Sequence, residues 1–87
     1  MGDYADEEQA RVFVDLLGRE IEDISDQIEC EELRARSATA RTDMPTFELH
    51  HTQALALRST LYELHRQLQA LDVRFPRLRI RTPRSHE

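Results

Sequence analysis

The chain has 87 residues, of which 33% are charged and 39% hydrophobic, and its formal net charge at pH 7 is −5. This length limits it to one domain, and so short a chain buries only about 60–65% of the surface that it exposes when unfolded. The one cysteine, Cys30, excludes an intramolecular disulfide and a thiolate metal cluster. All twelve basic residues are arginines, which excludes mechanisms that need a lysine nucleophile and points to a bacterial or phage origin.

Charge is distributed unevenly along the sequence. Residues 1–32 contain twelve acidic residues and two arginines, a net charge of −10. Residues 33–71 have a net charge of +2, and residues 72–87 have a net charge of +3. We expect an antiparallel arrangement to set the acidic start beside the basic end, so that the charges neutralise one another within one molecule or across a dimer. A bipolar surface that binds two charged partners is the alternative.

The first half of the chain predicts one amphipathic helix over residues 4–38. Its apolar residues recur in alternating steps of three and four, which keeps them on one stripe of an α-helix: Val14, Leu17, Ile21, Ile24 and Ile28. Gly18 and Ser25 fall at heptad position e beside this stripe, where small side chains permit close approach of a neighbouring helix. A glycine that is merely tolerated, at a cost of about 1 kcal/mol, is the alternative for Gly18. Beyond this ladder, small and polar residues predict fraying from about Arg36.

The second half predicts a matching helix over residues 45–73. Its ladder has the same spacing: Ala54, Leu57, Leu61, Leu64, Leu68 and Leu71. Asp43 or Thr46 can begin this helix. The two ladders together predict an all-α fold, an antiparallel two-helix, coiled-coil-like hairpin over residues 1–75. We expect a second copy or another partner to complete the core of so small a structure.

An extended basic tail is predicted over residues 76–87. Arginine and apolar residues alternate in it, and a period of two is typical of a strand with one basic and one apolar edge: Arg77, Leu78, Arg79, Ile80 and Arg81. We expect this segment to dock on a partner or a neighbouring subunit. Docking on the first helix of its own chain, at Val12 and Leu16, is the alternative.

Apolar residues outside the two ladders predict association with another chain. Leu33, Leu55 and Tyr62 lie beside the predicted seam, where a second hairpin could reach them to form a four-helix dimer. We therefore predict that these residues and the tail bind the partner: Leu33, Leu55, Tyr62, Arg77, Leu78, Arg79, Ile80 and Arg81.

Four histidines suggest a metal site, but the spacing of the histidines and carboxylates along the sequence does not fit one. Glu48 and His51 form an E-x-x-H step one helical turn apart, as in di-iron helical bundles, and Glu31 could face His50 or His51. The further carboxylates of such a site are not evident, and His51 and His65 are about 21 Å apart along a helix. We expect no metal, no cofactor and no metal-ligating residues.

We find no catalytic motif in the sequence. Its two glycines are too few for a phosphate-binding loop, and no nucleophile–base signature is present. We therefore expect no enzyme and no catalytic residues. We expect a non-catalytic protein–protein interaction module: a small adaptor, regulator or assembly subunit that presents a rigid helical hairpin. An antitoxin-like or nucleic-acid-associated regulator, whose arginine-rich tail contacts phosphates, is the alternative. The acidic body would repel nucleic acid, so the expected partner is this chain itself, another protein, or both.

The N-terminus is acidic where a secretory leader is basic, and no apolar run is long enough to span a bilayer. We expect a cytoplasmic protein that has no membrane partner.

Overall fold

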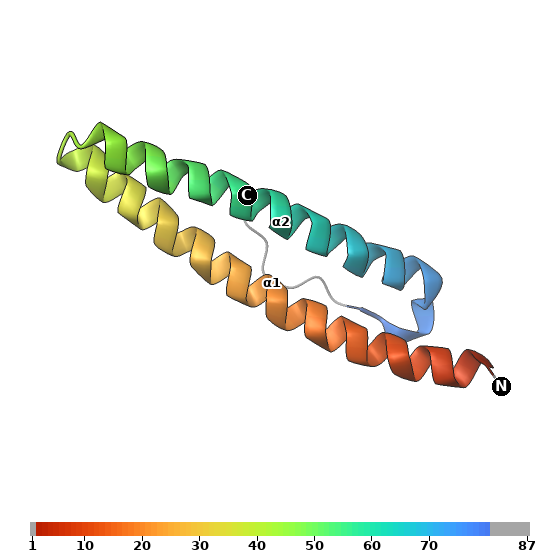
Figure 1. The fold of residues 1–87 in the computed structure, drawn as a ribbon. Helices are drawn as coiled ribbons and strands as arrows, with labels where there is room; N and C mark the ends of the chain where they lie inside the picture. Colours follow the sequence, from red (N-terminus) through yellow and green to blue (C-terminus); the bar gives the residue numbers. More distant parts are fainter. Residues whose placement is uncertain (1, 81–87) are drawn as a thin grey trace.

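Two long antiparallel helices, joined by a tight turn, make up most of the molecule (Figure 1). The computed structural model describes residues 2–80, with side chains from residue 6 onward. Helix α1 spans Gly2–Ala40, helix α2 spans Met44–Arg74, and one 3₁₀ turn, η1, follows at Pro76–Leu78. The predicted all-α hairpin is therefore confirmed. The molecule is elongated, with extents of 61 × 17 × 15 Å.

The seam between α1 and α2 is built from the two predicted ladders. Ile21 and Ile28 are fully buried at its centre. Burial of each such side chain contributes about 1.5–3 kcal/mol to folding, so this seam is the main source of stability. Its members are Leu17, Ile21, Ile24, Ile28, Leu61 and Leu68, with Val14, Leu57, Leu64 and Leu71 partly buried against them.

The sequence predicted Ser25 beside this seam, but the residue lies inside it. The residue is fully buried, and its Oγ has no hydrogen-bond partner among the described residues. A seven-residue repeat drifts by about 20° per heptad in a straight α-helix, and this drift turns position e toward the facing helix. One polar atom is therefore enclosed among apolar side chains.

The closed end of the hairpin is better packed than predicted. Fraying from Arg36 does not occur, because α1 remains helical to Ala40, two residues beyond its predicted end. Ala35 and Ala38 are both buried. Their small side chains let α2 approach closely, which offsets the loss of larger apolar groups in this part of the seam.

The turn between the helices uses hydrogen bonds at both helix ends. Thr42 adopts a left-handed conformation with φ of 57°, and the N–H of Asp43 donates to the carbonyl oxygen of Ala38 at 2.9 Å. This bond satisfies a carbonyl that the end of α1 would leave unpaired. Asp43 then caps α2, since its Oδ1 accepts from the N–H of Thr46 at 3.3 Å.

The described part of the segment after α2, residues 76–80, does not form the extended strand that the alternating sequence predicted. Pro76–Leu78 forms the turn η1, and Arg79 is left-handed with φ of 51°. The N–H of Leu78 donates to the carbonyl of Phe75 at 3.1 Å. A lone strand would have no neighbour to pair its backbone groups, whereas the turn pairs some of them locally. Arg81 and the remaining predicted tail lie outside the described residues.

Candidate interaction surfaces

The outer face of α2 carries a line of exposed apolar side chains. Met44, Leu55, Tyr62 and Val73 are between 50% and 76% exposed. They are separated by 11, 7 and 11 residues. At about 100° per residue, each of these steps returns to within roughly 20° of the same direction, so the four side chains share one face. This line, here called the α2 stripe, points about 130° away from the buried seam.

A second exposed apolar patch lies on α1 near the open end of the hairpin. Val12, Phe13 and Leu16 are each more than half exposed. The sequence suggested that the tail docks at Val12 and Leu16 if it folds back on its own chain. The described tail residues Leu78, Arg79 and Ile80 line a hollow with Arg11, Val14 and Asp15 of α1 instead. The side chains of Val12, Phe13 and Leu16 form a second candidate contact surface.

The predicted partner-binding residues fall into two groups. Leu55 and Tyr62 share the α2 stripe, whereas Leu33, which is 60% exposed, projects from the outer side of α1. The three therefore do not form one flat surface. Sequence reasoning missed Met44 and Val73, because the 11-residue step of three helical turns is not a heptad step, although the spacing itself is visible in the sequence.

The predicted tail residues that the structure describes fold back against the hairpin. Ile80 packs partly buried against the core cluster, and Leu78 is half-buried. Arg77 Nε lies 3.4 Å from Glu7 Oε2 on α1, while Arg79 is exposed. Docking on a partner was the favoured prediction for this segment, and it stays a prediction, because Ile80 is only partly buried here. The apolar side chain of Ile80 finds cover on its own helices.

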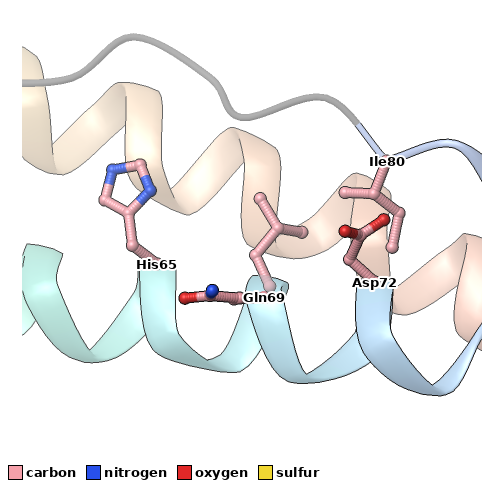
Figure 2. A pocket seen from close by; sticks show the side chains of 5 residues that line it. His65, Gln69, Asp72 and Ile80 are labelled. Carbon is pink, nitrogen blue, oxygen red and sulfur yellow. The ribbon is translucent and has the colours of Figure 1, made fainter. Parts of the chain in front are cut away.

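Ile80 lines a small hollow on α2 near the open end of the hairpin. Figure 2 shows His65, Gln69 and Asp72 along α2, with Ile80 beside Asp72. The hollow that they line has a volume of about 300 Å³. The Nε2 atom of His65 is buried and has no hydrogen-bond partner among the described residues. The polar side chains that line this hollow, His65, Gln69 and Asp72, all come from α2.

A polar cluster near the closed end joins α1 to α2. Glu31 Oε2 lies 2.6 Å from His50 Nδ1, and both side chains are largely buried. Arg34 donates to Glu31 Oε1 at 3.3 Å. The side chain of Gln53, with its amide nitrogen facing Glu31, donates to both carboxylate oxygens at 3.2 and 2.8 Å. The predicted approach of Glu31 to a histidine is confirmed for His50, whereas His51 stacks on Phe47 with ring centroids 5.2 Å apart.

Charge pairs between the two halves of the chain offset part of the charge asymmetry. Arg58 on α2 pairs with Glu32 on α1, and Arg77 pairs with Glu7. Such pairs at the surface each contribute roughly 0–1 kcal/mol. They support neutralisation within one molecule at these positions.

Within residues 2–80, no group of three or more histidine, cysteine, aspartate or glutamate side chains is arranged to hold a metal ion. No helix in the described part of the chain combines the length and the apolar character needed to cross a bilayer. Comparison with protein-family models, curated proteins and solved structures gives no match. The fold itself defines the class, an all-helical two-helix hairpin.

Proposed function

We propose that this chain is a non-catalytic protein–protein interaction module, a small bacterial or phage adaptor, regulator or assembly subunit. The observation that supports this function is the amount of apolar surface left on the hairpin. Among residues 6–80, whose side chains the structure describes, nine large apolar side chains are at least half exposed, nearly as many as the ten apolar residues that are buried. They are Val12, Phe13, Leu16, Leu33, Met44, Leu49, Leu55, Tyr62 and Val73.

Isolated apolar residues on a surface are ordinary, but several on one face mark an interaction site. The α2 stripe and the patch at Val12, Phe13 and Leu16 are both of this kind. The hairpin beneath them supplies a stiff support, because each helix is held against the other along most of its length. A partner helix laid along either face would bury these side chains together.

Sedimentation equilibrium of the full chain over a wide concentration range tests this proposal. We expect a mass that rises with concentration, or capture of a partner that competes with self-association. A chain that stays monomeric at every concentration, and that binds no protein through Leu55 or Tyr62, would contradict the proposed function.

The second candidate, a nucleic-acid-associated regulator, is supported by the exposed Arg77 and Arg79 at the open end. Against it, Arg77 already pairs with Glu7. Titration with generic DNA or RNA at rising salt separates the two functions, because binding through phosphate contacts weakens steeply with ionic strength. Tight binding at low salt that is lost at moderate salt would favour this second candidate.

A further inference from the structure

We infer that the α2 stripe is the contact of a twofold-symmetric dimer, in which α2 of one chain packs antiparallel against α2 of a second copy. This inference rests on the proposed function and names the partner and the register. The stripe is formed by Met44, Leu55, Tyr62 and Val73, and it extends over 30 residues, about 44 Å of helix.

The spacing along the stripe is symmetric about its own centre. The steps of 11, 7 and 11 residues read the same in both directions, with the midpoint between Arg58 and Ser59. A twofold contact requires this property, because residue i must meet residue j while j meets i. An antiparallel pairing about that midpoint sets Met44 against Val73 of the second copy, and Leu55 against Tyr62. All four apolar side chains of each copy then find an apolar counterpart.

The charges beside the stripe fit the same register. Glu48 and Arg66 lie on one flank of the stripe, about 20–40° from its centre line. In the antiparallel pairing this flank faces the same flank of the second copy, and Glu48 comes within about one helical turn of Arg66 across the contact. Arg66 pairs with Glu63 at 3.2 Å on an exposed surface, and so weak a pair can exchange partners. The dimer therefore gains two opposite-charge pairs.

The charge closest to the twofold axis does not oppose this pairing. Arg58 would approach its own copy near the centre, but its guanidinium is paired with Glu32 of α1 in the same chain. That pair turns Arg58 toward α1 and offsets its charge. Of the described residues that follow α2, Ile80 packs against the core cluster beside His65 and Leu68, and the four side chains of the stripe stay exposed.

Disulfide trapping tests the register directly. Two variants, Ser59→Cys and Thr52→Cys, each made together with Cys30→Ser, place one cysteine on exposed positions of α2. In the inferred dimer, the two copies of residue 59 are offset by one residue, with Cα atoms about 6 Å apart, which a disulfide can span. The two copies of residue 52 are about 20 Å apart along the axis.

We expect mild oxidation to convert most of the Ser59→Cys variant, and little of the Thr52→Cys variant, into covalent dimer on a non-reducing gel. Equal trapping of both variants, or none, overturns the inferred register. Sedimentation of Tyr62→Ser beside Leu33→Ser gives the matched comparison, because both side chains are similarly exposed at 66% and 60%. We expect the first substitution to weaken the dimer by at least about tenfold and the second to leave it unchanged.

These results separate the inference from the proposed function. Self-association that Tyr62→Ser and Leu33→Ser weaken equally would overturn the α2 contact while leaving an interaction module in place. Absence of any association, of the chain with itself or with another protein, would overturn both.

Discussion

The buried hydroxyl of Ser25 gives the sharpest test of the seam, because its replacement by alanine should make the protein more stable. Ser25 is fully buried and its Oγ lacks a hydrogen-bond partner among the described residues. Leaving a buried polar group unpaired costs about 1–3 kcal/mol, and alanine has a helix propensity better than serine by about 0.5 kcal/mol. The small void left by the oxygen offsets part of this gain. We expect Ser25→Ala to raise the free energy of unfolding by about 1–2 kcal/mol.

Urea denaturation and thermal melting followed by circular dichroism measure this change. For a chain of this size, each kcal/mol raises the Tm by roughly 4–8 °C. Ser59→Ala, compared at a concentration where the chain is monomeric, is the control, since Ser59 is exposed in the single chain and the change alters helix propensity without changing burial. A Ser25→Ala variant that is no more stable than the Ser59→Ala variant, or is less stable than the original chain, would show that the hydroxyl is hydrogen-bonded and refute this reasoning.

Four further predictions follow from particular contacts. Gly18→Ala should stabilise the monomer by about 0.5–1 kcal/mol in a thermal melt, because an added Cβ would meet no atom within 4 Å; lower stability would indicate that a neighbouring helix packs there. Ile24→Asp should abolish the helical circular dichroism signal, since it buries an unpaired charge at a position only 8% exposed, whereas Leu33→Asp should leave it unchanged. Ile80→Ser should lower the Tm by several degrees by removing the partly buried contact of the C-terminal segment, and an unchanged Tm would mean that this segment does not contribute to folding. Hydrogen bonds from the side chain and then the N–H of Thr46 hold the pKa of Asp43 below its ordinary value of 3.8; its stabilising contribution is therefore present above pH 3.8 and lost as the pH falls through the lowered pKa. The Tm of Asp43→Asn, which keeps a capping side chain, should fall less steeply over that acidic range.

The ladders predicted the two helices well because their apolar period is long and uninterrupted. The helix ends were predicted within two residues, and both helices extend slightly beyond their predicted ends. At the closed end, Ala35 and Ala38 were interpreted as a weak layer, yet small residues permit the closest packing of two helices. Side-chain volume in the sequence does not by itself show whether a neighbouring helix can move in to fill the space.

The segment after α2 shows where pattern reasoning is weakest. Five alternating residues are too few to fix a strand, since the backbone groups of a strand need a neighbour to pair with. Local hydrogen bonds from the turn η1, together with burial of Ile80, determine the observed conformation. The sequence predicted part of the α2 stripe, because Leu55 and Tyr62 are separated by a seven-residue step. The rest of the α2 stripe became apparent once α2 was known to extend from Met44 to Arg74 without a break.

The slender shape of the hairpin affects how its association state has to be measured. A compact domain of 87 residues has a radius of gyration of about 12 Å, whereas this molecule has one of 17.0 Å. A single chain will therefore leave a size-exclusion column early, at the volume of a globular protein considerably heavier than 10.2 kDa. A second hairpin added alongside would thicken the rod more than it would lengthen it, so its elution would change less than its mass. Elution volume alone would confuse the two forms, and scattering intensity or sedimentation would distinguish them.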